Sequence, residues 1–385
     1  MTSAGTSAAG TSAAGTTPDG TGAFAVVATP GDRRAVLFAD ACRSCDLPEP
    51  RVVPWTDVLR GGDLAFGPGE LVRIDSPGED AEADALLRGP GDPTRVGGGA
   101  RWHRTFTAAL GRIDAAATAA GAHIVGDVED IAVMFDKRLS HARMLAAGVP
   151  VPPALGSADA PVRDYASLRD AMAGAGERRV FVKPAHGSSA SGVVALQTAS
   201  GGRIRAITSA AMTPDGLRNS LRVRTYLTEA EVASLIDALA PDGLHVERWV
   251  PKASIGGRTF DLRVVVVGGE PAHAVVRTSS HPMTNLHLGG ARGDLEAVRR
   301  ALGTDGWAEA MDVCARAAAC FPGSTMVGVD LLVLSRMRSF AVCEVNAFGD
   351  LLPRLTGFPG GPAEGVDTYT AQVRAVCGER RPCVT

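Results

Sequence analysis

The chain has 385 residues, which is long enough for more than one domain. Of these residues 45% are hydrophobic and 21% charged, a composition typical of a globular protein. Its formal net charge of −3 offers no basic surface for nucleic acid or an anionic membrane. No apolar run approaches the ~20 residues of a membrane-spanning helix, and the N-terminus lacks the features of a secretory signal, so we expect a cytoplasmic protein.

Residues 1–22 repeat Thr-Ser-Ala-Ala-Gly, which predicts a disordered tail. Residues 23–128 are predicted to form an α/β domain with a parallel sheet, because short apolar strands alternate with helical segments. The strands are expected at 25–28, 52–55 and 70–74. No G-x-G-x-x-G follows the first strand, and no G-x-x-x-x-G-K-[ST] occurs, so neither a Rossmann cofactor nor a P-loop is indicated.

A helix is predicted over 129–150, where a glycine and three prolines end it. Another helix, at 165–172, is followed by a hairpin with strands at 179–183 and 193–196. After Val223 strands and helices alternate to the end of the chain. The expected elements are strands at 244–250, 260–267, 273–278, 328–334 and 340–346, and a helix across 294–320.

Lysine is rare in this sequence, where Lys137, Lys183 and Lys252 are the only lysines among 39 basic residues. A chain that uses arginine almost everywhere else has kept lysine where a compact point charge is of use, unless its positions are accidental. Lys183 ends the first strand of the hairpin and precedes a loop of small residues from His186 to Gly192. Such a loop can bring backbone N–H groups close to phosphate oxygens, although a plain turn would look the same.

Asp330, Glu344 and Asn346 are polar residues in otherwise apolar strands. Glu344 and Asn346 are two residues apart, so their side chains point to the same face. Two carboxylates and an amide oxygen are the ligands that magnesium prefers, and we favour a metal site over a structural salt bridge with a buried arginine.

Asp261 and Arg263 also share one strand face, and Arg277 ends an apolar run on the next strand. Arginines beside a magnesium site suit the binding of phosphate or carboxylate groups. For Asp261, a solvated Asp–Arg pair on the sheet surface is a serious alternative.

Taken in order, these features resemble the ATP-grasp superfamily, in the branch that contains glutathione synthetase and the ribosomal-protein glutamate ligases. The resemblance covers residues 129–350. The matching motifs are Asp136-Lys137, Phe-Val-Lys-Pro at 181–184 with the glycine loop, Glu247-Arg248-Trp249-Val250, Asp261-Leu-Arg263, Arg277, Asn285-Leu-His-Leu-Gly-Gly290, Gly-Val-Asp330-Leu-Leu and Glu344-Val-Asn346.

This resemblance implies an α/β fold in which the N-terminal parallel α/β domain precedes two α+β lobes that grip ATP between them. The central lobe would span 129–200 and carry the glycine flap, and the C-terminal lobe would span 201–385 and carry the metal site. Lys137 and Lys183 would bind the phosphates under the flap, whose residues include Gly187, Ser188, Ser189 and Gly192. Glu247, Arg248, Trp249 and Val250 would form the adenine-binding hinge.

By the same resemblance, Arg277, Asn285 and Arg263 would act in catalysis. Asp330, Glu344 and Asn346 would hold two magnesium ions, which manganese could replace. The implied activity is that of an ATP-dependent carboxylate–amine ligase that works through an acyl phosphate and releases ADP and phosphate. Two alternatives remain open, namely a small-molecule kinase of the same fold and a catalytically silent nucleotide-binding regulator.

The expected partners are a small-molecule carboxylate and an amine, which could be amino acids or a peptide, and a homodimer is compatible with the sequence. Two departures from the glutamate ligases lie on the substrate side. Leu288 stands where those enzymes have an arginine, and the residues after Asn346 lack their Pro-Gly stretch. The identity of the substrates therefore does not follow from the resemblance.

Overall fold

The structure, a computed structural model, describes residues 23–378 apart from 79, 157–159, 188–189 and 350–351, so the tail predicted at 1–22 lies outside the described residues. The first domain is a parallel sheet with the strand order β2-β1-β3-β4, which confirms the predicted α/β domain. Its elements are β1 (Phe24–Ala28), α1 (Arg33–Ser44), β2 (Arg51–Pro54), α2 (Trp55–Arg60), β3 (Leu71–Ile74), α3 (Ala81–Arg88), α4 (Gly99–Ala120) and β4 (His123–Val125).

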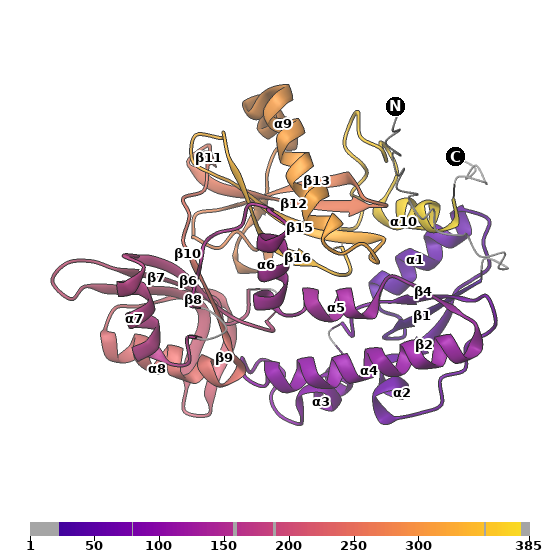
Figure 1. Cartoon of the computed structure of the whole chain (residues 1–385), viewed down its shortest axis with the longest axis horizontal. Coiled ribbons are helices and arrows are strands. Elements are labelled where there is room, and N and C mark those ends of the chain that lie inside the picture. Colours follow the sequence, from indigo (N-terminus) through magenta and orange to yellow (C-terminus); the bar gives the residue numbers. More distant parts are fainter. Residues whose placement is uncertain (1–22, 79, 157–159, 188–189, 350–351, 379–385) are drawn as a thin grey trace, which may run out of the picture.

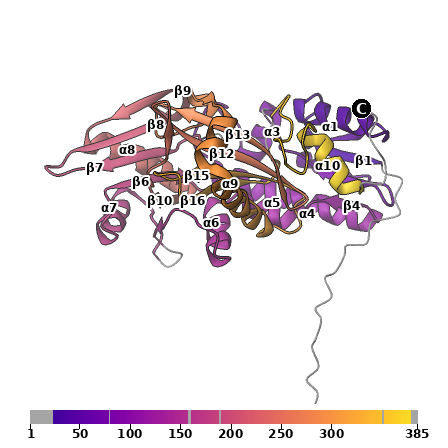
Figure 2. The same cartoon turned by 90° about the horizontal axis from the view of Figure 1, so that it is seen from above.

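Helices cover both faces of this sheet, as a parallel sheet with apolar strands requires. Phe24, Val26 and Ala28 of β1 pack on α1 and on the last helix, α10 (Thr368–Cys377), whereas Ala25 and Val27 face α2, α3 and α4. The C-terminal helix therefore returns to the first domain, and Figure 2 shows it beside α1.

Two helices replace the single helix predicted over 129–150, namely α5 (Val128–Met134) and α6 (Lys137–Ala146). The break lies at Asp136, whose backbone is extended (φ −115, ψ 109) and whose carboxylate accepts hydrogen bonds from the N–H groups of Arg138 and Leu139. At Asp136 the capping hydrogen bonds that start a new helix are thus favoured over one continuous helix. As a result Lys137 is the first residue of α6, and its N–H donates to the Ala185 carbonyl at 2.9 Å.

The second sheet is antiparallel, with the strand order β5-β10-β6-β7-β8-β9. The hairpin predicted at 179–196 is confirmed as β6 and β7. A turn at Gly201 and Gly202, with φ of +73° and +71°, then leads into β8, so the boundary expected between 200 and 201 falls inside this sheet. In chain order, the strands of this sheet and the helices between them are β5 (Ala154–Leu155), α7 (Tyr165–Gly174), β6 (Arg179–Pro184), β7 (Val194–Thr198), β8 (Ile204–Thr213), β9 (Gly216–Tyr226), α8 (Glu229–Leu239), η1 (Ala240–Asp242) and β10 (Leu244–Arg248).

The third sheet has the strand order β14-β13-β12-β15-β16, and β11 pairs with β12. Helix α9, which is kinked at Gly303 (φ +71°), covers one face. Val327, Val329 and Leu331 of β15 contribute to the core on that face, so Asp330 between them points to the opposite face. The elements are β11 (Ser254–Ile255), β12 (Arg258–Val267), β13 (Glu270–Ser279), η2 (Leu286–Leu288), β14 (Ala291–Arg292), α9 (Leu295–Ala319), β15 (Met326–Val333) and β16 (Phe340–Asn346).

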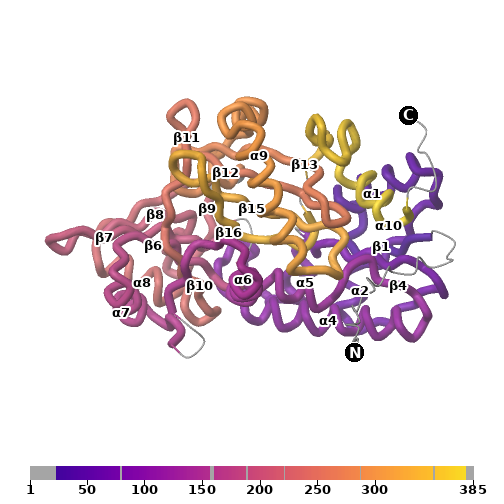
Figure 3. Tube along the Cα trace, turned by 45° about the horizontal axis from the view of Figure 1, so that its top comes forward, coloured from indigo at the N-terminus to yellow at the C-terminus, as the bar shows by residue number. Residues whose placement is uncertain are grey.

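Helix α6 lies where the second and third sheets approach the first domain (Figure 1 and Figure 3). Figure 1 places the first domain at one end of the molecule, the second sheet at the other end, and the third sheet between and above them. Figure 3 shows α6 at their junction, close to β10 and β16. Within the part of the chain that the structure describes, no helix is both long and apolar enough to cross a membrane.

Candidate active site

A cavity of about 520 Å³ lies at this junction, and it is lined by helix and loop residues of the first domain and by residues of the second and third sheets. Its volume is within the range of small-molecule sites. Most residues singled out in the sequence line it, although Trp249 and Gly192 do not, and Ser188 and Ser189 lie outside the described residues. The lining residues are Lys137, Lys183, Gly187, Glu247, Arg248, Val250, Arg263, Arg277, Asn285, Asp330, Glu344 and Asn346.

Lys183 and Glu247 form a buried ion pair on adjacent strands, with 2.6 Å between Nζ and Oε1. Their side chains are only 6% and 2% exposed. Burial opposes the charge of Glu247, but Lys183 and His245 outweigh this effect and lower the pKa of Glu247 to about 2. Burial also opposes the charge of Lys183, yet Cys343 and Glu247 hold the pKa of the lysine above its usual value. Both groups are therefore charged inside the cavity.

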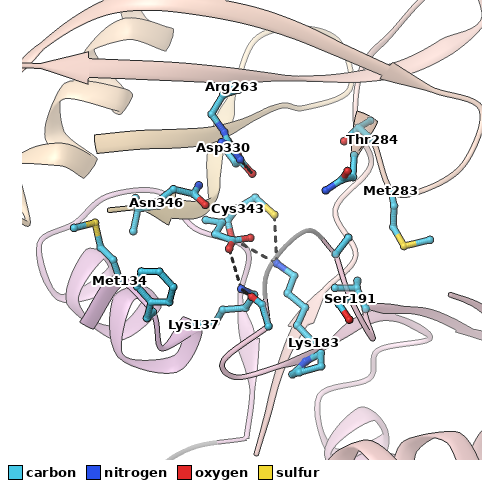
Figure 4. Close-up of a pocket in the computed structure, with 18 of the residues that line it drawn as sticks. Met134, Lys137, Lys183, Ser191, Arg263, Met283, Thr284, Asp330, Cys343 and Asn346 are labelled. Carbon is cyan, nitrogen blue, oxygen red and sulfur yellow. Dashed lines mark hydrogen bonds and ion pairs between the residues drawn. The ribbon is translucent and has the colours of Figure 1, made fainter. Parts of the chain in front are cut away.

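Lys137 forms a second pair across the cavity. Its ammonium lies 2.8 Å from Oε1 of Glu344 and donates to the Gly187 carbonyl at 2.6 Å. The helix break at Asp136 makes this possible, because it sets Lys137 at the start of α6 and beside the loop after β6. Figure 4 shows Lys137 and Lys183 pointing toward the strand that carries Cys343.

Asp330 lies between two arginines. Arg263 contacts both of its carboxylate oxygens, and Nη2 of Arg277 lies 3.1 Å from Oδ2. The strand register explains the first contact, because Arg263 and Asp330 are directly opposite each other on β12 and β15. Burial would raise the pKa of Asp330, but the two guanidinium groups hold it far below the usual range. Arg277 also donates to Asp261 at 2.8 Å, which continues the chain of alternating charges.

Asp330, Glu344 and Asn346 share one wall of the cavity. Asp330 pairs with Glu344 across β15 and β16, and Asn346 is opposite Gly328. Asn346 donates its amide N–H to the Gly328 carbonyl at 3.3 Å, so its amide oxygen is the atom that would bind a cation. The described residues contain no group of three or more His, Cys, Asp and Glu side chains that could hold a metal. Two carboxylates and one amide nevertheless fit a hard cation that retains water or phosphate ligands.

The segment after β10 passes along one edge of the cavity. Arg248 lines it, and its guanidinium is engaged by Glu177 at 2.5 Å. Trp249 packs against Phe181, with ring centroids 5.3 Å apart, and Arg179 lies 4.1 Å from the Trp249 ring. Trp249 therefore supports Phe181, which does line the cavity, from behind.

Gly192 and Gly290 are required by their surroundings. At Gly192 φ is +71°, and a Cβ atom would lie 2.6 Å from Val96 and 2.9 Å from Pro184, so this glycine lets the loop after β6 pack closely. At Gly290 a Cβ atom would lie 2.7 Å from the Asn285 carbonyl, which accepts hydrogen bonds from Leu288 and Gly290. The second glycine thus allows the tight turn that holds Asn285 at the cavity.

Two further cavity residues had no role assigned from the sequence. Lys252 donates to the Thr284 hydroxyl at 3.0 Å and lies 3.5 Å from Asp261, so it supports both the Asn285 loop and the partner of Arg277. Cys343 lies 3.3 Å from the Lys183 ammonium, and burial raises the pKa of its thiol to about 11. The rarity of lysine was a signal for Lys252, whereas nothing in the sequence indicated Cys343.

No protein-family model matches the sequence, and no curated protein matches it either. Solved structures do match over nearly the whole chain. D-cycloserine synthetase DcsG is 19% identical with a TM-score of 0.56, and the match covers 93% of this chain and 99% of that one. The ATP-grasp ligase PsnB complexed with a minimal precursor is 18% identical with a TM-score of 0.51, covering 92% and 97%. The same ligase with minimal precursor, Mg and ADP gives the same values.

Proposed function

We propose that this chain, which has the fold of the ATP-grasp ligases, joins a carboxylate to an amine at the expense of ATP and releases ADP and phosphate. The observation that carries the proposal is the arrangement of charges in the cavity. Glu247, Glu344 and Asp330 are each held by a lysine or by arginines that line the same cavity. Such pairs can separate when a phosphate and a metal ion enter between them.

The two lysines would bind the nucleotide phosphates. A lysine ammonium is a compact charge that can exchange a carboxylate partner for a phosphate oxygen without moving far. The adenine would lie along Arg248 and Val250 and bind their backbone groups, and Phe181 offers an aromatic wall. The complex of PsnB with Mg and ADP supports a nucleotide in this fold.

Asp330, Glu344 and Asn346 would hold two magnesium ions, or manganese in their place. When bound, the metal would neutralise charge on the phosphate oxygens. Charge balance supports this assignment, because Lys137 would leave Glu344 for a phosphate and thereby free a carboxylate for the cation. Arg263 would stay with Asp330 and fix the orientation of its carboxylate.

The reaction would begin when the substrate carboxylate attacks the γ-phosphate and forms an acyl phosphate with release of ADP. Lys137 and Lys183 would align the phosphates, which is most of what phosphoryl transfer requires. The loop from Gly187 to Gly192 would cover the site and exclude water. The amine would then attack the acyl carbon, Arg277 and Asn285 would stabilise the oxyanion, and phosphate would leave.

A screen for ADP release tests the proposal. Amino acids and small carboxylic acids are offered singly and in pairs, with and without magnesium. We expect ADP release that requires magnesium, an acid and an amine together. If one hydroxyl compound alone sufficed, the chain would be a kinase of the same fold. A chain that binds nucleotide but releases no ADP with any pair would fit a regulator instead.

A further inference from the structure

One corner of the cavity belongs to the first domain and has no part in the chemistry described above. Arg34, in the first turn of α1, lines the cavity together with Ser76 and Gly78, which follow β3. All three residues lie outside the stretch from 129 to 350 that resembles the ATP-grasp superfamily. They therefore offer information about what this chain binds beside the nucleotide.

This corner lies at the carboxyl ends of two neighbouring parallel strands. The loop after β1 leads to α1 on one face of the sheet, whereas the loop after β3 leads to α3 on the other face. The two loops thus diverge and open a crevice, and open α/β sheets bind their ligands at such a point. Thr29 donates its hydroxyl to the Pro77 carbonyl at 2.7 Å, which fixes the two loops against each other.

Arg34 is the positively charged group in this crevice, where the carboxylate of Asp32 also lies close to Gly78. The Nε atom of Arg34 is buried and has no hydrogen-bond partner within the described residues. Asp32, two residues earlier, uses its carboxylate to accept from the backbone N–H of Arg34 at 2.8 Å, and no ion pair between the two side chains is present. Arg34 as a whole is half-buried and lines the cavity, so an anion there can accept hydrogen bonds from the outer N–H groups of its guanidinium.

The other cations nearby are already neutralised. Arg88 also has a buried Nε without a hydrogen bond in the part of the chain that the structure describes, but it forms an ion pair with Asp84 at 3.1 Å, and Arg73 is buried against Asp75. Gly78 shapes the crevice, because its φ is +73° and a Cβ atom would lie 3.2 Å from Oδ2 of Asp32. A side chain at this position would crowd the Asp32 carboxylate and strain the backbone. Within the described residues, the crevice therefore combines two loops in close contact with an arginine whose guanidinium forms no ion pair.

We propose that Arg34, with the loop at 76–78, binds an anionic group of the substrate other than the carboxylate that reacts. The inference rests on the proposed ligase function and deepens it: one of the two substrates carries an additional carboxylate or phosphate. A guanidinium binds either group with two parallel hydrogen bonds. The ATP-binding residues activate the reacting carboxylate, and Arg34 selects molecules that reach from there to the first domain.

Isothermal titration calorimetry with two probes tests this site. Succinate represents a second carboxylate and glycerol 3-phosphate represents a phosphate, and each is titrated into the protein with and without bound Mg-ADP. We expect one probe to bind the wild type, and Arg34→Gln to weaken its binding at least about tenfold. Arg34→Lys should restore part of the affinity. Arg33→Gln is the matched control, because Arg33 is the neighbouring exposed arginine and its loss removes the same charge.

Absence of binding by both probes would overturn the anion site, as would an equal loss of affinity in Arg33→Gln and Arg34→Gln. The affinity for Mg-ADP, measured in the same proteins, reports separately on the proposed function. It should be unchanged in both arginine variants. If the wild type bound no Mg-ADP, the ligase proposal would fail, and the titration without nucleotide would still decide whether Arg34 binds an anion.

Discussion

A buried ion pair in the first domain differs in its surroundings from a buried ion pair in the second sheet. Arg73 and Asp75 in the first domain have side chains that are 2% and 1% exposed, and Lys183 and Glu247 in the second sheet are 6% and 2% exposed. Gln372 of α10 accepts from Arg73 at 3.1 Å, and the rings of Phe38 and Tyr369 flank its guanidinium. The first pair is sealed from the large cavity and borders a separate one of about 20 Å³, whereas the second pair lines the large cavity.

Burial of an ion pair therefore does not by itself identify a functional site. Both pairs incur the cost of removing charges from water, and both need their partners to offset it. Arg73 and Asp75 use this to dock the C-terminal helix on the first sheet. Lys183 and Glu247 remain accessible to a ligand, so their partners can be exchanged. The two pairs should therefore respond differently to substitution.

The largest effect on activity is expected for Lys183→Arg. The charge is kept, so Glu247 retains a partner and the melting temperature should change little. The planar guanidinium cannot replace the compact ammonium at a phosphate, and ADP release should fall by about 10²–10³-fold. A variant with near-normal ADP release would remove Lys183 from the nucleotide site.

Arg73→Gln should show the opposite behaviour. Removing one partner of a sealed pair leaves the Asp75 carboxylate buried without its cation, which costs about 3–5 kcal/mol of stability. Denaturant unfolding measures that loss. The affinity of the remaining folded protein for Mg-ADP should equal that of the wild type, and a selective loss of nucleotide binding would show that the sealed pair also serves the cavity.

A smaller effect is expected for Asn346→Ala. Loss of a neutral ligand should raise the magnesium concentration that half-maximal ADP release requires by about 10–100-fold, while saturating magnesium restores the rate. Asp330→Asn should not be rescued, because it removes charge that attracts the ion and also leaves Arg263 and Arg277 without their shared partner. If magnesium affected neither variant and both lost thermal stability, the residues would form a structural cluster.

The smallest effect concerns His186, which follows β6 and stacks on His103 with ring centroids 4.2 Å apart. Burial is the main cause that lowers the pKa of His186 to about 4, although the negative charge of Asp136 acts in the opposite direction and raises it. The unfolded chain, with a histidine pKa of about 6.5, therefore takes up a proton first as the pH falls. This contribution to stability is complete above about pH 6.5 and is lost toward pH 4. Melting curves of the wild type and His186→Gln should diverge in that range, and parallel curves would contradict this.

Strand periodicity predicted part of the site. The spacing of Glu344 and Asn346 placed both side chains on one face, and both line the cavity. The end of a strand at Lys183 was also predictable, since the hairpin is bounded by small residues. Such local patterns suffice wherever one strand or one loop determines where a side chain points.

Other features depend on contacts between distant segments. Arg263 faces Asp330 because of the register of β12 and β15, which no local pattern reveals. Cys343 reaches the cavity because β16 contains a bulge: Asp330 pairs with Glu344 and Leu331 with Val342, so Cys343 is the extra residue. The cap at Asp136 competes with a continuous helix, and only the hydrogen bond from the Lys137 N–H to the Ala185 carbonyl shows why the break is favoured.

The proposed reaction depends on an acyl phosphate, which hydroxylamine converts to a stable hydroxamate. Wild-type protein is incubated with the acid found in the ADP-release screen, Mg-ATP and hydroxylamine in place of the amine. We predict a hydroxamate of that acid, formed in step with ADP and absent with Lys183→Arg. ADP release that is not accompanied by hydroxamate would mean that the phosphoryl group passes to another acceptor, and the chain would not be a carboxylate–amine ligase.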